Sequence, residues 1–317
     1  MQVLSVRVIK RTAPELRFGW RGAKRSLVRT ILSFSSSLFV IDMATRLQTK
    51  TDEMVIGVFL SIGSITPYSL ARRLSEVAQI LTDQFMKVLL PLASELDAEN
   101  DRARLRSLYI TSTRLTLAIF LPVGCVLIVF ASAILSAWVG AEYAEYSHLV
   151  IILTVASLIA TSQWPAGSIL QGIARHRLLA GTSTCSALAN LALSIGLLYP
   201  FGLMGVALGT LIPTTAECLG FVLPYAMRVV GVSTSEAFKQ IFLPSMIPAV
   251  PMIIFLYVLQ RVVEPLSLLS IMPLAGVGVV VYLTGYLSMG ASAVERQICR
   301  SFAASTMRFA KARLKFS

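Results

Sequence analysis

Charged residues are scarce in this 317-residue chain, where Asp, Glu, Lys and Arg make up only 14% of the sequence and hydrophobic residues make up 56%. Soluble domains carry about 25% charged residues, so this composition excludes an ordinary soluble protein. Cysteine and histidine are equally rare, with four and two copies. The cysteines have no metal-ligand spacing and none is placed to form a disulfide, so we expect no disulfide, no metal site and no cofactor.

Motifs for catalysis are also missing. The chain has no glycine-rich phosphate loop and no nucleophile motif, and its two histidines, His148 and His176, are expected at opposite membrane faces. Residues 1–25 are charged throughout and lack the apolar core of a cleavable signal peptide. The sequence therefore predicts a protein that is not an enzyme, has no catalytic residue and uses its first span as its insertion signal.

Apolar stretches dominate what is present. Most of them reach the roughly 20 residues that a helix needs to cross a bilayer. Thr66 and Pro67 predict the N-cap and first position of the second helix, and Pro91 and Pro165 predict the ends of the second and fourth. We predict an all-α integral membrane protein of about eight transmembrane helices, at 30–48, 67–90, 115–136, 149–170, 178–199, 204–226, 241–259 and 266–288.

Basic residues fall on alternate sides of these spans, and most of them share the side of the N-terminus. Such asymmetry indicates a cytoplasmic location for that side, so we expect a multi-pass protein of the bacterial inner (plasma) membrane with both termini cytoplasmic. The net charge of +12 lies in short loops that meet anionic lipid head groups, which argues against nucleic-acid binding. Three regions follow: a basic cytoplasmic lead-in at 1–25, a helical bundle at 26–290 and a basic amphipathic cytoplasmic tail at 291–317.

A polar stripe runs along the second span. At 100° per residue its side chains fall within about 100° of arc, with apolar residues over much of the remainder. Asp42 and Arg46 repeat the pattern more weakly in the first span. Ionised groups at mid-membrane cost about 2.5–3.5 kcal/mol each on insertion scales, so the stripe is expected to face a water-filled cavity or other protein. The alternative is that these charges are structural ion pairs that tie helices together, with Lys87 snorkelling from the interface. Arg72 with Glu76 and Asp83 with Lys87 are also i,i+4 pairs that can offset each other's charge. The predicted cavity-lining residues are Asp42, Arg46, Tyr68, Arg72, Glu76, Gln79, Asp83 and Lys87.

Several short segments resemble a known family. They are Thr51-Asp52-Glu53-Met54-Val55-Ile56-Gly57-Val58-Phe59-Leu60, Pro67-Tyr68-Ser69-Leu70-Ala71-Arg72-Arg73-Leu74, Pro91-Leu92-Ala93-Ser94, Trp138-Val139-Gly140-Ala141-Glu142-Tyr143 and Gly202-Leu203-Met204-Gly205-Val206-Ala207. In order and spacing they are similar to the C-terminal half of a polysaccharide flippase, the O-antigen and exopolysaccharide branch of the multidrug/oligosaccharidyl-lipid/polysaccharide (MOP) exporter superfamily.

The resemblance implies two helical lobes around a polar cavity and transport by alternating access, for polysaccharide biosynthesis. The implied partners are membrane lipid and a polyprenyl-pyrophosphate-linked oligosaccharide. It also implies that Arg46, Arg72 and Lys87 meet sugar or pyrophosphate, while Asp42, Glu76 and Asp83 balance charge or couple cations. The chain resembles the C-terminal lobe plus two extra helices, so we expect a truncated or half-length form that works with a separate N-terminal lobe or a second copy.

Other functions stay open at this point. The chain could be a membrane scaffold in a polysaccharide assembly complex that transports nothing itself. It could also be a drug/cation antiporter-like or lipid-II-flipping member of the same superfamily. A membrane-embedded glycosyltransferase is disfavoured, because the outer loops are too short to build a catalytic site.

Overall fold

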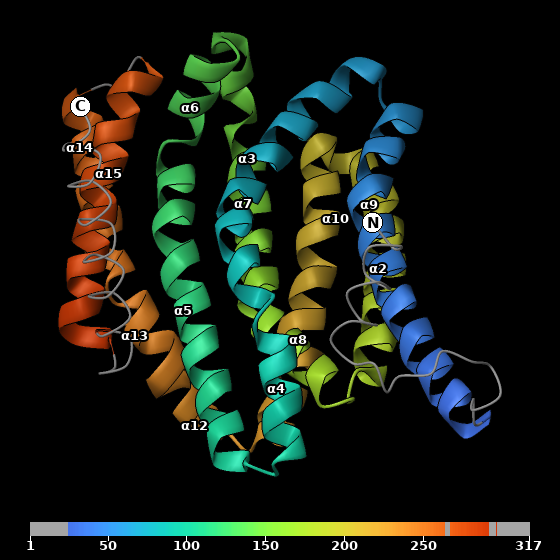
Figure 1. Ribbon diagram of the computed structural model, residues 1–317. Coiled ribbons are helices and arrows are strands. Elements are labelled where there is room, and N and C mark those ends of the chain that lie inside the picture. The colour runs from blue at the N-terminus through green and yellow to red at the C-terminus, as the bar shows by residue number, and fades with distance from the viewer. Residues whose placement is uncertain (1–24, 264–266, 292–295, 297–317) are drawn as a thin grey trace, which may run out of the picture.

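The computed structural model describes residues 25–263, 267–291 and 296, and within these ranges the regular secondary structure is helical throughout (Figure 1). The predicted lead-in and tail fall almost wholly outside the described residues. The α-helices are α2 (Arg25–Phe59), α3 (Ile62–Met86), α4 (Leu89–Ala98), α5 (Arg102–Val129), α6 (Ala131–Trp138), α7 (Ser147–Ser162), α8 (Trp164–Gly172), α9 (Arg177–Phe201), α10 (Leu203–Thr215), α11 (Leu223–Val230), α12 (Thr234–Ala237), α13 (Leu243–Met246), α14 (Ala249–Val263) and α15 (Leu268–Gly285).

Four shorter turns connect or interrupt these helices. One is the 3₁₀ turn η2 (Ala141–Tyr146), and three are π-helical turns, η3 (Ala216–Val222), η4 (Phe238–Phe242) and η5 (Tyr286–Gly290). Because η3, η4 and η5 continue into their neighbours, several helices join into longer rods.

Six helical stretches within the described residues are long and apolar enough to cross a membrane: Arg102–Val129, Ala141–Gly172, Arg177–Phe201, Leu203–Val230, Thr234–Val263 and Leu268–Ser288. The long helices α2 and α3 run beside them but carry more charged residues. With these two, the described residues form the number of long helical rods expected from the sequence. It is a multi-pass membrane protein of the predicted all-α class.

The rods form a bundle whose two sides differ in composition. α9 and α10 make an antiparallel hairpin against α2, while α3 packs on α5 and α7 (Figure 1). α14 and α15 contact α5 on the opposite side. α5 lies between these parts, and its buried Tyr109, Leu117 and Phe120 anchor the core. The charged helices α2 and α3 therefore lie on the side away from α14 and α15.

Two glycines allow the α9–α10 hairpin to close. Gly205 and Gly209 form a small-xxx-small spacing on α10, the pattern that lets membrane helices approach closely. A Cβ atom at Gly205 would collide with the carbonyl of Leu197, and one at Gly209 would collide with Ser194 on α9. The close approach brings polar groups of the two helices within hydrogen-bonding distance of each other.

Several predicted helix boundaries are wrong. The segment after residue 48 is helical, because α2 continues unbroken to Phe59. Ser61 caps α3 by accepting from the backbone N–H of Ser64 at 3.2 Å, so Pro67 lies inside the helix. Loss of one backbone hydrogen bond does not end a helix that is packed on its neighbours.

Two prolines that were expected to end helices instead lie in the first turn of a further helix. Pro91 is the third residue of α4, and Pro165 is the second residue of α8. The first four N–H groups of a helix have no acceptor within it, so a proline there removes no bond. The second and fourth spans therefore each continue past their proline as a short additional helix.

Candidate functional site

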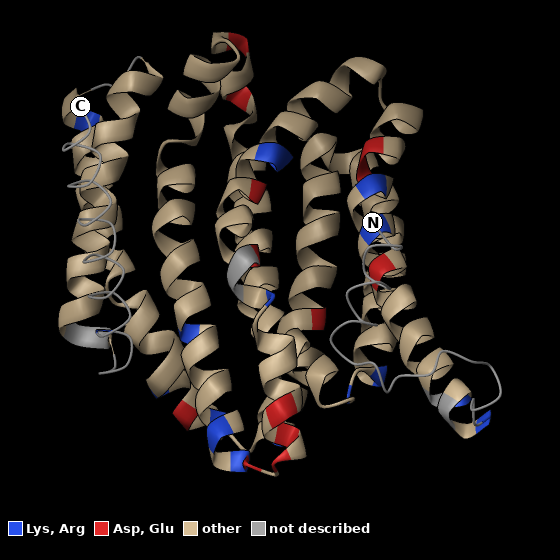
Figure 2. Cartoon of the chain, in the orientation of Figure 1, with Lys and Arg blue, Asp and Glu red and all other residues tan. Residues whose placement is uncertain are grey.

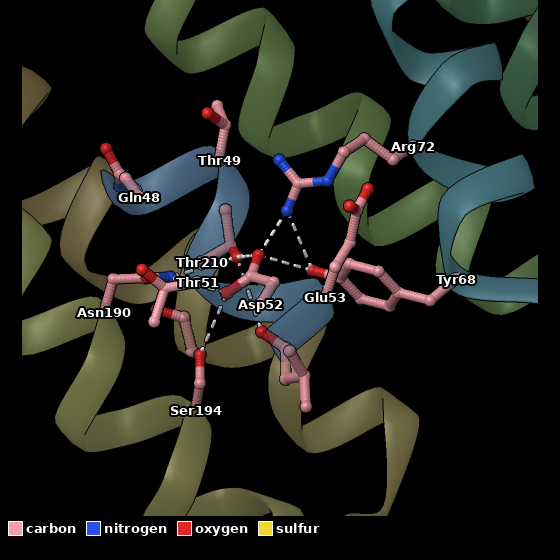
Figure 3. A network of polar contacts seen from close by, with 12 residues as sticks. Gln48, Thr49, Thr51, Asp52, Glu53, Tyr68, Arg72, Asn190, Ser194 and Thr210 are labelled. Atoms are coloured by element: carbon pink, nitrogen blue, oxygen red, sulfur yellow. Dashed lines mark hydrogen bonds and ion pairs between the residues drawn. The ribbon is translucent and has the colours of Figure 1, made fainter. Parts of the chain in front are cut away.

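Asp52, near the end of α2, is the centre of a buried polar network (Figure 3). Its side chain is fully buried, and its carboxylate accepts hydrogen bonds from residues on α3, α9 and α10. Tyr68 donates to Oδ2 at 2.7 Å, and Thr210 donates to the same oxygen at 2.8 Å. The network thus joins four helices at one point.

Arg72 supplies the compensating positive charge. One of its terminal nitrogens forms an ion pair with Asp52 Oδ2 and donates to the Tyr68 hydroxyl at 3.2 Å. The guanidinium carbon lies 5.4 Å from the centre of the Tyr68 ring, in cation–π range. The side chain of Arg72 is only 12% exposed. Removing one partner of a buried pair leaves an uncompensated charge, so both residues have a strong structural role.

The α9–α10 hairpin contributes the rest of the network. Asn190 Nδ2 and Ser194 Oγ each lie 3.4 Å from Asp52 Oδ1, one helical turn apart on α9. Asn190 Nδ2 also lies 3.2 Å from the carbonyl of Gly209 and 3.2 Å from Thr210 Oγ1. The tight helix contact at Gly209 and the ion pair are therefore parts of one arrangement.

A cavity of about 390 Å³ opens among α2, α3, α7, α8, α9 and α10. Asp83 and Glu217 are the charged residues of its wall, and Glu217 accepts from Ser183 at 2.7 Å. Trp164 and several amides and hydroxyls complete the wall. The polar lining residues include Thr45, Gln48, Gln163, Ser168, Gln171, Ser183 and Thr214. This combination of amide, hydroxyl, carboxylate and indole groups suits a neutral polar ligand with many hydroxyl groups.

A smaller cavity of about 170 Å³ adjoins the first, because both are lined by Thr45, Gln48 and Thr214. Its wall on α3 contains Arg72, Glu76 and Gln79. The Arg72 side chain therefore borders the cavity while it is paired with Asp52. The two cavities and the network form the candidate functional site.

The residues of the predicted polar stripe are distributed between the two cavities and the Asp52 network. Asp83 lines the larger cavity, and Arg72, Glu76 and Gln79 line the smaller one. Tyr68 is buried against Asp52 instead of facing a cavity.

The remaining charges of the stripe form exposed pairs. Arg46 pairs with Asp42 at 2.8 Å and Lys87 with Asp83 at 3.2 Å. Arg72 forms its ion pair with Asp52 on α2 and not with Glu76 one turn along α3, so this pair ties two helices together. Whether any of these residues touches a transported molecule stays a prediction.

Sequence reasoning missed the residues at the centre of the network. Asp52 lies in one of the family-like segments but is not among the predicted cavity-lining residues. Asn190, Ser194 and Thr210 were also overlooked. The available signal was a lone asparagine in an apolar span, because polar side chains in such spans commonly hydrogen-bond across helices.

Comparison with known proteins gives three findings. A family model described as "Polysaccharide biosynthesis protein" matches residues 2–148. A probable low-salt glycan biosynthesis flippase, Agl15 of Haloferax volcanii, is 22% identical over 182 residues, which cover 57% of this chain and 39% of that protein. A solved structure of the lipid II flippase MurJ, in an inward closed conformation, superposes with a TM-score of 0.65 at 18% identity. That match covers 89% of this chain and 58% of MurJ, and it bears on the fold alone.

The chain thus spans less than two thirds of the length of either relative. Both relatives are named as flippases, which are transporters. The family model and the archaeal relative agree with the resemblance carried by the sequence motifs, and the MurJ-like fold agrees with the predicted all-α membrane architecture.

Proposed function

We propose that this chain is part of a transporter that flips a lipid-pyrophosphate-linked oligosaccharide across a membrane for polysaccharide biosynthesis. The observation that carries the proposal is the pair of adjoining polar cavities between α2, α3 and the α7–α10 helices. Polar cavities within a membrane bundle mark pathways for polar substrates, because the same groups would be costly against lipid. The glycan and lipid II flippases among its relatives support the same class of substrate.

The lining suggests how the parts of such a substrate would be bound. Sugar hydroxyls would exchange hydrogen bonds with Gln48, Gln163 and Glu217, and the indole of Trp164 offers an apolar face to a sugar ring. The pyrophosphate would be attracted to Lys87 and Arg46, which stay largely exposed in their ion pairs. Glu76 and Asp83 would balance these charges.

We further propose that a second lobe, or a second copy of the chain, faces α2 and α3 and completes the transport pathway. The chain corresponds to 58% of the MurJ chain it resembles, and α2 exposes Phe39, Met43 and Leu47 beside the Asp42–Arg46 pair. A mixed apolar and charged face of this kind fits protein–protein contact within a bilayer. Both termini would be cytoplasmic in a bacterial inner membrane, as the basic loops indicate.

Blocking the cavity after folding would test the proposal. Thr45 lines both cavities, whereas Val262 lies near the end of α14 with 76% of its surface exposed and lines neither cavity. Thr45→Cys and Val262→Cys would each replace the chromosomal copy, in a chain whose four native cysteines have been removed. A water-soluble maleimide should react with the cysteine at position 45 and stop glycan export, so that the lipid-linked precursor accumulates.

The Val262→Cys cells should continue export under the same treatment. Precursor and surface glycan would be measured by lipid extraction and mass spectrometry, and cysteine modification by the mass shift of the protein. Full modification at position 45 with unchanged export would refute a transport role for this cavity and favour a scaffold.

A further inference from the structure

A notch lined by arginines lies apart from the transport cavities. Its wall consists of Asp97, Arg102, Ile173, Arg175, Arg228 and Val229, and its volume is about 460 Å³. None of these residues lines either cavity of the candidate site. We propose that the notch binds the phosphate group of an anionic membrane lipid, and this inference does not depend on transport.

The position of the notch corresponds to the head-group level of a membrane. Arg102 is the first residue of α5, Arg228 lies in the last turn of α11, and Arg175 lies between α8 and α9. Each point is the end of a stretch long and apolar enough to span a bilayer. Charged residues gather at this end of the bundle, around α4, α5 and α12 (Figure 2). Arginines at the ends of spans meet the phosphates of anionic lipids.

The charge balance of the notch favours an anion. Arg102 is partly neutralised by Asp97 at 3.4 Å. Within the described part of the chain, Arg175 and Arg228 have no recorded ion pair. Two exposed guanidinium groups beside a third, half-neutralised one give a net positive site. Guanidinium groups bind phosphate oxygens with paired hydrogen bonds, which a phosphodiester can accept.

The backbone fixes the three arginine-bearing segments before any ligand arrives. Ala174 has a φ of 56°, and the turn is held by the Arg175 N–H donating to the Leu170 carbonyl at 2.7 Å. Asn100 has a φ of 55° just before α5, and Gly231 has a φ of 77° just after α11. Left-handed residues of this kind close helix ends in defined geometries. The arginines therefore extend from fixed positions.

A lipid is favoured over soluble phosphate because the notch is not wholly polar. Ile173 and Val229 form part of its wall and can contact the glycerol and upper acyl region of a lipid. A soluble anion would gain nothing from these side chains.

Lipid binding to the purified full-length chain would test the proposal by native mass spectrometry. Phosphatidylglycerol should bind in preference to phosphatidylcholine. Arg175→Gln/Arg228→Gln should weaken binding of phosphatidylglycerol about tenfold, because two charge-assisted contacts are lost. Asp97→Asn should strengthen it about threefold by freeing Arg102. The matched control is Arg104→Gln/Lys239→Gln, which removes the same charge from exposed positions outside the notch.

Other outcomes would overturn the proposal. An equal loss in the control would show that only net charge matters. Unchanged binding after loss of both arginines would place the lipid elsewhere. Inorganic phosphate that displaces the lipid at millimolar concentration would indicate a soluble ligand. Stronger binding of undecaprenyl pyrophosphate that depends on the same arginines would assign the notch to the transported substrate. Arg175→Lys/Arg228→Lys, which keeps the charge, should retain part of the affinity if the fold is intact.

Discussion

The buried ion pair between Asp52 and Arg72 should dominate the stability of the α2–α3 side of the bundle. Asp52→Asn and Arg72→Gln each leave a buried group with an unmatched charge or unused hydrogen-bond donors. Loss of one partner of a buried pair costs about 3–5 kcal/mol. Hydrogen bonds between membrane helices average about 0.6 kcal/mol, so the charge and not the number of contacts should set the size of the effect.

The chain contains a matched control for this prediction. Asp42 and Arg46 form a pair of the same residue types at 2.8 Å, but their side chains are 56% and 69% exposed. Exposed pairs separated by one helical turn contribute about 0.3–0.5 kcal/mol. Asp42→Asn and Arg46→Gln should therefore change the free energy of unfolding by less than about 1 kcal/mol.

Unfolding of the purified chain in mixed micelles of mild detergent and dodecyl sulfate would measure these differences. The double variant Asp52→Asn/Arg72→Gln should lose clearly less free energy of unfolding than the two single variants added together. The reason is that the double variant leaves no buried charge without a partner. Single variants no more costly than the Asp42 and Arg46 controls, or strict additivity in the double variant, would refute the reasoning.

Two further predictions concern helix packing and pH. Gly209→Ala should lower the free energy of unfolding by about 1–3 kcal/mol, because the new methyl group collides with Ser194. Gly196→Ala is the control, because a methyl group at that position meets open space. Unfolding in detergent would compare the two variants, and equal losses of stability would contradict the prediction. His176 is 5% exposed, and burial together with the nearby Arg177 lowers its pKa. The unfolded chain therefore binds the proton more readily, so stability should be fully present above about pH 6.5 and fall as the pH is lowered below that value. His176→Gln should flatten this dependence in unfolding curves recorded between pH 5 and 8, and an unaltered slope would exclude His176 as the cause.

Composition was enough to predict the class of fold, because the length and apolarity of the spans depend on local sequence alone. The direction of the α3 stripe was also predictable from helical periodicity. Glu76, Gln79 and Asp83 lie along the two cavities, while Val77, Ile80 and Leu81 are exposed; a role of the stripe in transport stays a prediction. Helical periodicity predicts which face of a helix is polar, but not which neighbouring helix packs against that face.

The partner of Arg72 could not be predicted for that reason. Glu76 is the neighbour that periodicity suggests, but Asp52 lies on another helix and is fully buried. Asn190 and Ser194 join Asp52 from about 140 positions further along the chain, through a hairpin whose spacing depends on Gly209. The predicted helix boundaries at Pro67 and Pro91 were wrong for a related reason. A proline can begin a helix or lie within it, and packing decides between these outcomes.

The charge on α2 and α3 has a consequence for biosynthesis. Both helices are less apolar than the six stretches that qualify as spans by themselves, so each alone would enter a bilayer at a high cost. They are adjacent in the chain, and the Asp52–Arg72 pair needs only these two helices. Asn190, Ser194 and Thr210 are synthesised much later and complete the hydrogen bonding of Asp52 only then. We therefore expect α2 and α3 to enter the membrane as a pair, with the buried network completed only when the α9–α10 hairpin is in place.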